Sequence, residues 1–247
     1  MSKIALVTGA GRGIGAAIAE ALGKAGFLTW VNYSKSSEAA EKVCARIREA
    51  GGNAYPIQAD VGKYSDIQKM FDEIEKKHGA VDILVNNAGI EIRMPATDYP
   101  EEIYDSIMNI NLKGAYFCSQ RALRTMKKRN WGRIINISSV HEERPTGNRG
   151  IYSISKAGMW MMTREHAKEY GTFGITVNSI APGAIRTDLN RKVLEDPAYE
   201  EMVLRNIPAK FIAEPYDISG AVVFLTSEEA RYVNGASLTI DGGLSLN

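Results

Sequence analysis

Short runs of apolar and β-branched residues alternate along the chain with longer segments whose apolar residues recur at helical spacing. The short runs are almost continuously apolar, which is typical of parallel strands that helices cover on both faces. The pattern predicts strands over Ile4–Val7, Leu28–Asn32, Ala54–Gln58, Ile83–Val85, Arg133–Ser138, Thr176–Ile180 and Leu238–Ile240. It predicts helices near Gly13–Ala25, Ser37–Ala50, Ser65–His78, Tyr99–Arg129, Tyr152–Tyr170 and Ala213–Leu225.

This alternation of strand and helix predicts an α/β fold with a doubly wound parallel sheet of about seven strands. No repeat, low-complexity tract or linker-like stretch interrupts the 247 residues, so we expect a single domain over residues 1–247. Ligands of such folds bind beyond the carboxyl ends of the strands. The charged segment 188–206 follows one of these ends, and we expect it to form either a lid over the substrate or surface helices.

Composition and charge narrow the class of protein. The 30 basic residues balance 29 acidic ones and give a net charge of +1, so no overall field favours nucleic acid or an anionic membrane. No apolar run reaches the roughly 18 residues of a membrane span, and the first strand leaves no room for a signal peptide. We therefore expect a soluble, cytoplasmic protein. The two cysteines, Cys44 and Cys118, are too few for a disulfide framework or a zinc site, and no metal is expected.

A glycine-rich turn follows the first predicted strand. It reads Thr8-Gly9-Ala10-Gly11-Arg12-Gly13-Ile14-Gly15 and leads directly into a predicted helix. Glycines permit a sharp turn and a close approach of the backbone to a pyrophosphate, which the N–H groups of the helix then bind. Strand, turn and helix together predict a dinucleotide site, and a glycine-rich loop without a ligand is the alternative.

The spacing of these glycines, T-G-x-x-x-G-I-G, resembles the signature of the short-chain dehydrogenase/reductase family. Ser139 lies 13 residues before Tyr152, as the active-site serine of that family does. Further stretches occur in the order in which the family has them, over nearly the whole chain. They are Asn86-Asn87-Ala88-Gly89, similar to N-N-A-G, Tyr152 with Lys156, similar to Y-x-x-x-K, Pro182-Gly183, and Asp241-Gly242-Gly243.

Tyr152 and Lys156 are four residues apart, so on a helix they share one face. A phenol has an ordinary pKa of about 10, and a neighbouring cation moves this pKa toward the working range. The resemblance implies that Tyr152 is the acid/base, that Ser139 orients the substrate oxygen, and that Lys156 lowers the pKa of Tyr152 and binds the ribose. It also implies that Asn111 anchors a water that relays protons, with Asn109 as the alternative.

The end of the second strand bears on the choice of cofactor, because an acidic residue there binds the ribose 2′-OH of NAD. The chain has Tyr33 at this position and no carboxylate before Glu38. Arg12, Ser34 and Lys35 would surround a 2′-phosphate, so we predict NADP as the preferred cofactor, with NAD possible if these cations are only solvated. The expected cofactor contacts are Gly9, Gly11, Arg12, Gly13, Ile14, Gly15, Tyr33, Ser34, Lys35, Asp60, Val61, Asn87, Ala88, Gly89, Tyr152, Lys156, Pro182, Gly183, Ile185 and Thr187.

The substrate is indicated by two stretches that resemble bacterial glucose 1-dehydrogenases, Ser138–Glu142 (S-S-V-H-E) and Asn87–Glu91 (N-A-G-x-E). With Ser139 and Tyr152, the polar Glu91 and His141 would suit an aldose or a polyol, since each buried hydroxyl needs a partner. Glu91 pairing with Arg93 at a surface is the alternative for that residue.

Two other functions are open. One is reduction of a 3-oxoacyl thioester on an acyl-carrier protein, which the basic residues Arg93, Arg144, Arg149 and Arg186 would favour. The other is a redox sensor that binds a dinucleotide without turnover. The family resemblance also implies a homotetramer.

Overall fold

The computed structural model describes residues 2–188, 190 and 194–246. In this part of the chain seven parallel strands form one sheet with the order β3-β2-β1-β4-β5-β6-β7. The order reverses between β1 and β4, which confirms the predicted doubly wound α/β fold. The strands are β1 (Ile4–Val7), β2 (Leu28–Tyr33), β3 (Asn53–Gln58), β4 (Ile83–Asn86), β5 (Gly132–Ile137), β6 (Ile175–Pro182) and β7 (Ser237–Ile240).

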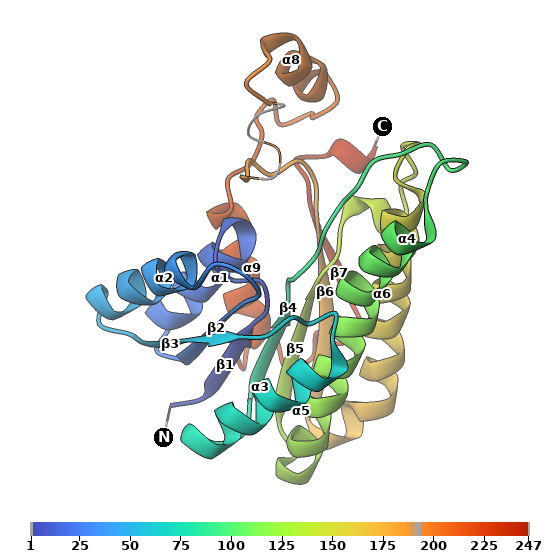
Figure 1. Cartoon of the computed structure of the whole chain (residues 1–247). Helices are drawn as coiled ribbons and strands as arrows, with labels where there is room; N and C mark the ends of the chain where they lie inside the picture. Colours follow the sequence, from blue (N-terminus) through green and yellow to red (C-terminus); the bar gives the residue numbers. More distant parts are fainter. Residues whose placement is uncertain (1, 189, 191–193, 247) are drawn as a thin grey trace.

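Helices cover both faces of the sheet (Figure 1). One layer consists of α1 (Gly13–Lys24), α2 (Ser37–Glu49) and α9 (Tyr216–Thr226). The opposite layer consists of α3 (Tyr64–Lys77), α4 (Glu101–Met108), α5 (Ala115–Arg129) and α6 (Gly150–Tyr170). A further helix, α8 (Pro197–Arg205), projects beyond the carboxyl edge of the sheet.

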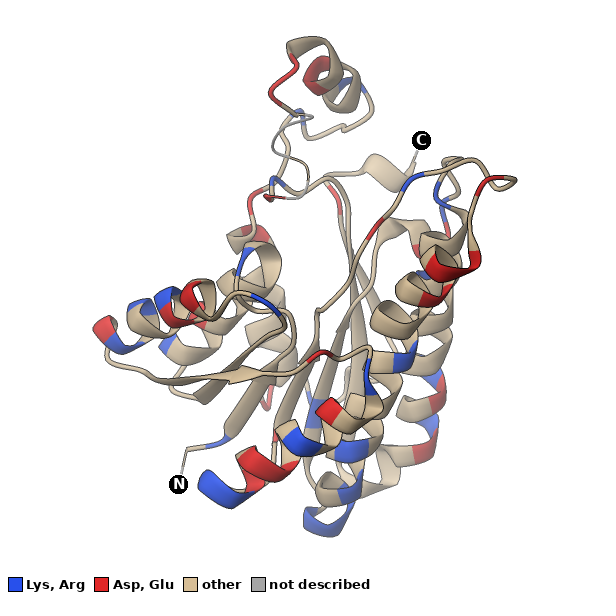
Figure 2. Ribbon diagram, in the orientation of Figure 1, with Lys and Arg blue, Asp and Glu red and all other residues tan. Residues whose placement is uncertain are grey.

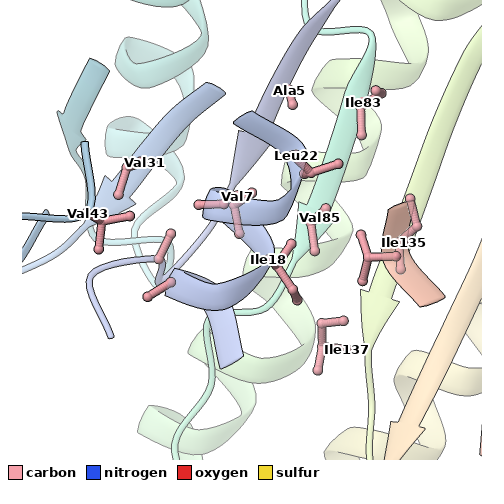
Figure 3. Close-up of a cluster of buried hydrophobic side chains, with 14 of the residues drawn as sticks. Ala5, Val7, Ile18, Leu22, Val31, Val43, Ile83, Val85, Ile135 and Ile137 are labelled. Atoms are coloured by element: carbon pink, nitrogen blue, oxygen red, sulfur yellow. The ribbon is translucent and has the colours of Figure 1, made fainter. Parts of the chain in front are cut away.

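An apolar cluster joins each layer to the sheet. In Figure 3, Ile18 and Leu22 from α1 lie over Val7 and Val85 of the two central strands. Every residue of β1, β4, β5 and β6 is buried, which explains why these strands read as continuous apolar runs. The edge strands β3 and β7 also carry exposed residues.

The prediction of one long helix over Tyr99–Arg129 is wrong, because a π-helical turn at Asn109–Gly114 separates α4 from α5. The turn brings the chain close to Val61, since a Cβ added at Gly114 would lie 2.6 Å from the carbonyl oxygen of Val61. A π-helical turn inserts a residue into the helical repeat and so rotates the side chains of the turn relative to both helices. Helical periodicity does not reveal such an insertion.

The segment 188–206 is described in part. Its helix α8 begins with a cap, since the carboxylate of Asp196 accepts a hydrogen bond from the Ala198 N–H at 3.0 Å. Residues 189 and 191–193 of the expected lid lie outside the described residues.

The contact between α1 and α2 predicts the effect of a glycine substitution. A Cβ at Gly23 would lie 2.4 Å from Cγ2 of Ile47. We expect Gly23→Ala to lower the free energy of unfolding by about 1–3 kcal/mol, because the buried contact becomes overpacked. Thermal unfolding would show this as a fall in Tm of about 2–4 °C per kcal/mol.

Gly220 provides the matched control. It lies in α9 with no atom within 4 Å of an added Cβ, so Gly220→Ala should keep or raise Tm by reducing the entropy of the unfolded chain. An unchanged Tm for Gly23→Ala would contradict the close packing of α1 on α2.

Candidate active site

Hydrogen bonds join the glycine turn to the residues that follow β4. Oγ1 of Thr8 accepts hydrogen bonds from the backbone N–H groups of Asn87 at 3.0 Å and Ala88 at 3.1 Å. In return, Nδ2 of Asn87 donates to the carbonyl oxygens of Thr8 at 2.9 Å and Gly9 at 3.1 Å. Gly9 has a φ of +62°, and a Cβ there would lie 2.8 Å from Cα of Ala88. Only glycine suits this position, and the turn and the N-N-A-G stretch form one packed unit.

The start of α1 fits the pyrophosphate of a dinucleotide. The residue before the helix, Arg12, makes no side-chain cap, and the first turn contains no acidic residue. The N–H groups at this helix end therefore favour an anion. Thr187 lies beside the same turn, since a Cβ at Gly13 would be 3.5 Å from its Cγ2. The remaining expected contacts from this side, Pro182, Gly183 and Ile185, follow β6 or end it.

The end of β2 presents cations rather than a carboxylate. Tyr33 ends the strand, and Ser34 and Lys35 follow it. The nearest carboxylate in the sequence, Glu38, pairs with Lys42 at 2.6 Å along α2. In the described residues, no ion pair engages Arg12 or Lys35. Asp60, after β3, holds its own loop through Oδ1, which accepts a hydrogen bond from the Gly62 N–H at 3.0 Å.

Ser139, Tyr152 and Lys156 come together beyond the end of β5. Ser139 follows this strand, and the other two residues lie on α6. Nζ of Lys156 donates a hydrogen bond to the carbonyl oxygen of Ile137 at 2.8 Å and lies 5.6 Å from the centroid of the Tyr152 ring. Ser139 lies close enough to Tyr152 to lower the pKa of its phenol. Lys156 is 4% exposed, so this cation is almost completely removed from water.

Burial governs the protonation of this group. It raises the pKa of Tyr152 to about 12, against the lowering effects of Ser139, Arg149 and Arg93. Burial also lowers the pKa of Lys156 to about 8. The lowering of the Tyr152 pKa by Lys156 stays a prediction, and the effect of burial, which removes the phenolate from water, is the larger one here. At neutral pH the resting side chain of Tyr152 is the protonated phenol.

Asn111 lies in the π-helical turn and is fully buried. Its Oδ1 accepts a hydrogen bond from the Ile90 N–H at 2.8 Å, and its Nδ2 donates to the Ile90 carbonyl and to Oγ of Ser155, each at 3.0 Å. Asn109 instead accepts a hydrogen bond from Lys113 in an exposed contact. Asn111 is thus the asparagine that joins the loop after β4 to α6 next to Lys156.

A charged cluster lies on the loops next to these residues. Oε1 of Glu91 accepts hydrogen bonds from Nε of Arg93 at 2.7 Å and from Nε of Arg149 at 2.5 Å. Nη1 of Arg93 donates to the hydroxyl of Tyr199 on α8 at 3.2 Å. Burial alone would raise the pKa of Glu91, but the two guanidinium groups hold it below its ordinary value. Glu91 is expected from the sequence, whereas its bond to Arg149, 58 residues away, has no signal in the chain.

His141 and Glu142 follow Ser139 in a single 3-10 turn. The His141 ring centroid is 6.1 Å from that of Tyr152, and its Nδ1 lies 3.0 Å from the carbonyl oxygen of Arg144. Burial lowers the pKa of His141, which favours the neutral ring. Oε1 of Glu142 accepts a hydrogen bond from Oγ of Ser237 at 2.5 Å, and burial raises the pKa of this carboxyl.

Two further properties concern the described residues as a whole. No group of three His, Cys, Asp or Glu side chains in them is arranged to hold a metal ion. None of the helices formed by these residues has the length and apolar character needed to cross a membrane.

Comparisons with known proteins agree with this geometry. A family profile described as enoyl-(acyl carrier protein) reductase matches residues 9–245. The chain is 40% identical to 3beta-hydroxysteroid dehydrogenase 1 of Eggerthella lenta, over 99% of this chain and 94% of that protein. It is 37% identical to the 3-oxoacyl-(acyl-carrier-protein) reductase of Staphylococcus epidermidis, over 99% of each, and to glucose 1-dehydrogenase 2 of Bacillus subtilis, over 99% and 95%.

Solved structures show the same similarity. A gluconate 5-dehydrogenase from Burkholderia cenocepacia in complex with NADP and tartrate superposes with a TM-score of 0.94 at 34% identity, over 100% of this chain and 97% of that one.

Because Lys156 is a buried cation, we expect its removal to raise the free energy of unfolding by an amount that depends on pH. The pKa of about 8 for Lys156, against its ordinary 10.5, corresponds to up to about 3 kcal/mol. Lys156→Met should therefore be more stable than the parent at pH 7. Between about pH 8 and 10.5 the unfolded parent retains a proton that the folded parent has lost, so the parent gains stability as pH rises and the difference shrinks. Urea unfolding at pH 7 and pH 9.5 measures both effects.

Lys168→Met is the control, since Lys168 is exposed on the same helix and should change stability little at either pH. A Lys156→Met variant that is less stable at pH 7, or a difference that does not change with pH, would contradict the burial of a protonated lysine.

Proposed function

The chain belongs to the short-chain dehydrogenase/reductase family, and from this we propose that it transfers hydride between NADP and a secondary alcohol or carbonyl of a polyhydroxylated, sugar-like substrate. Members of the family are oxidoreductases that act on alcohols and carbonyls. The observation that carries the proposal is the meeting of Ser139, Tyr152 and Lys156 at the carboxyl edge of the sheet that also holds the glycine turn, with charged side chains next to them.

The roles of these residues follow from their chemistry. A dinucleotide held at the glycine turn would supply the hydride chemistry at the carbinol or carbonyl carbon. In oxidation the phenolate of Tyr152 takes the hydroxyl proton at Oη, and in reduction the phenol supplies it, while Oγ of Ser139 holds the same substrate oxygen. With its pKa raised to about 12, the Tyr152 phenol is the form that donates a proton in reduction. Its phenolate requires the nearby Lys156 cation for stabilisation.

The charged cluster supports a hydrophilic substrate. A steroid, the substrate named for the Eggerthella relative, needs an extended apolar wall, whereas Glu91, Arg93 and Arg149 all act electrostatically on Tyr152 in this chain. The names of the Bacillus relative and the Burkholderia structure, which refer to glucose and gluconate, also favour a sugar-like compound.

Reduction of a 3-oxoacyl thioester is the second candidate, and the Staphylococcus relative favours it. This reading would use a basic surface for an acidic carrier protein. Arg186, however, pairs with Glu200 at 2.7 Å and with Glu214 at 3.3 Å. Because these two carboxylates compensate the charge of Arg186, this residue contributes little to a basic surface for a carrier protein. A sensor without turnover has no need for the Ser139, Tyr152 and Lys156 arrangement.

NADP is the cofactor that the end of β2 favours. Arg12 and Lys35 supply cations for a 2′-phosphate, while Glu38 is paired with Lys42. The Burkholderia structure contains NADP. We also expect a homotetramer, as in the family, with α8 acting as a lid through the hydrogen bond from Arg93 to Tyr199.

A substrate panel tests the proposed function. Purified protein with NADP⁺ should oxidise members of a set of aldoses, polyols and sugar acids. Reduction of an acetoacetyl thioester with NADPH should have a kcat/KM at least about tenfold lower, a difference in transition-state stabilisation of about 1.4 kcal/mol. Initial rates of NADPH formation or loss at 340 nm measure both. If the enzyme turned over only the thioester, the proposed substrate class would be wrong and the second candidate function would be favoured.

Tyr152→Phe tests the assigned chemistry. Loss of the phenolic hydroxyl should lower kcat by roughly 10²–10⁴-fold, because no other group next to the substrate oxygen exchanges its proton. The dissociation constant for NADPH, measured by fluorescence titration, should remain close to that of the parent. Turnover at the parent rate would exclude Tyr152 as the acid/base.

The cofactor preference predicts the effect of removing two cations. The double change Arg12→Gln with Lys35→Gln should lower kcat/KM for NADP⁺ by roughly 10–100-fold, as expected for lost charge-assisted hydrogen bonds, and leave that for NAD⁺ nearly unchanged. Lys24→Gln, at the opposite end of α1, is the control. A parent enzyme with higher kcat/KM for NAD⁺ than for NADP⁺ would overturn the preference.

A further inference from the structure

We infer that the substrate carries a carboxylate, and that Arg149 and Arg93 bind it. The inference rests on the polyhydroxylated substrate proposed above and specifies its charge. The compound would be a sugar acid or a related polyhydroxy acid rather than a neutral aldose.

The charges of the cluster do not balance. One carboxylate, that of Glu91, faces two guanidinium groups, those of Arg93 and Arg149, and one positive charge is left over. The side chain of Arg93 is 46% exposed, but those of Arg149 and Glu91 are only 17% and 28% exposed, so water compensates the charge of Arg149 poorly. Since a partly buried charge is costly without a partner, an anion entering the site would be favourable.

The neighbouring groups do not cancel the excess charge. Burial favours neutral His141, and Tyr152 is a protonated phenol. Glu142 and Lys156 interact electrostatically with each other. The excess therefore remains at the two arginines.

Both guanidinium groups retain donors that point to no described partner. Arg149 uses Nε for Glu91 and Nη1 for Oγ1 of Thr146 at 2.7 Å. Arg93 uses Nε for Glu91 and Nη1 for Tyr199. In the described part of the chain, no hydrogen bond engages Nη2 of either arginine. A planar guanidinium with unused N–H groups suits the two oxygens of a carboxylate.

The cluster lies beside the reacting groups. Arg149 directly precedes α6 and is three residues before Tyr152. On the other loop, Glu91 follows Gly89 by two residues, and a Cβ at Gly89 would lie 3.7 Å from Nζ of Lys156. An anion bound here belongs to the substrate molecule itself. It would lie much closer to Tyr152 than a charge on the surface of a carrier protein.

The two loops that hold the arginines are joined, so the cluster is preorganised. The N–H of Met94 donates to the carbonyl oxygen of Asn148 at 3.0 Å, and the hydroxyl of Tyr99 contacts the same carbonyl oxygen at 3.4 Å. Figure 2 shows charged residues of both signs on these loops at the carboxyl edge of the sheet. A rigid support reduces the entropy lost when a ligand binds and favours a specific anion site.

Matched substrates test the inference with the parent enzyme. We expect kcat/KM with NADP⁺ to be at least about tenfold higher for D-gluconate and related sugar acids than for D-glucose and sorbitol. Sugar phosphates form a third arm, because a phosphate would use the same arginines. A neutral aldose or polyol that is oxidised as well as its acid, or a sugar phosphate preferred over both, would overturn the carboxylate while leaving the proposed function intact. Turnover of only the acetoacetyl thioester would remove both.

Two variants locate the carboxylate. Arg149→Gln should lower kcat/KM for the sugar acid by roughly 10–100-fold, and Arg149→Lys should recover part of the loss, because a charge-assisted hydrogen bond is removed and a cation restored. The kcat/KM for a neutral polyol should change much less in both variants. The control is Arg46→Gln on α2, which breaks the exposed ion pair of Arg46 with Glu20 of α1.

Equal losses for charged and neutral substrates in Arg149→Gln would assign Arg149 a structural role and overturn the inference. Where this variant does not fold, competitive inhibition of the parent enzyme by tartrate provides the second measurement. Absence of inhibition, at concentrations that exceed KM for the sugar substrate many times, would equally overturn it.

Discussion

The reciprocal hydrogen bonds between Thr8 and Asn87 fix the geometry on which the rest of the site depends. They connect the chain after β1 to the chain after β4, and the strand order reverses between these two strands. The glycine turn belongs to one side of this point, and Ser139, Tyr152 and Lys156 belong to the other. A bound dinucleotide has to extend across the point to bring its reactive ring to the catalytic side chains. The position of the phenol relative to the ring is therefore set by strand packing rather than by flexible loops.

Burial gives the site its chemistry and also makes it costly for the fold. Lys156 keeps one hydrogen bond, to the carbonyl of Ile137, and is otherwise enclosed. The same loss of water that lowers the pKa of Lys156 raises that of Tyr152. In a site of low dielectric, the cation acts more strongly on a developing phenolate than it would in water. The enzyme thus accepts an unfavourable buried charge in the resting protein and uses it when the proton moves.

The sequence predicts the elements of the fold well. Buried parallel strands appear in it as continuous apolar runs, and turns are marked by residues that favour turns, such as glycine. The predicted strand Ile4–Val7 matches β1 at both ends. The π-helical turn is not predictable in this way, since it depends on a backbone contact between Gly114 and Val61 across the fold. The burial that raises the Tyr152 pKa is also not predictable from the sequence, because spacing along a helix indicates proximity but not the degree of burial.

The charged cluster shows the same limit and explains where specificity resides. Glu91 and Arg149 lie 58 residues apart, and only the neighbouring ends of β4 and β5 bring their loops together. Loops at this edge can change their side chains without disturbing the sheet, so relatives with one catalytic arrangement can act on different alcohols. In this chain the cluster also reaches α8 through Tyr199.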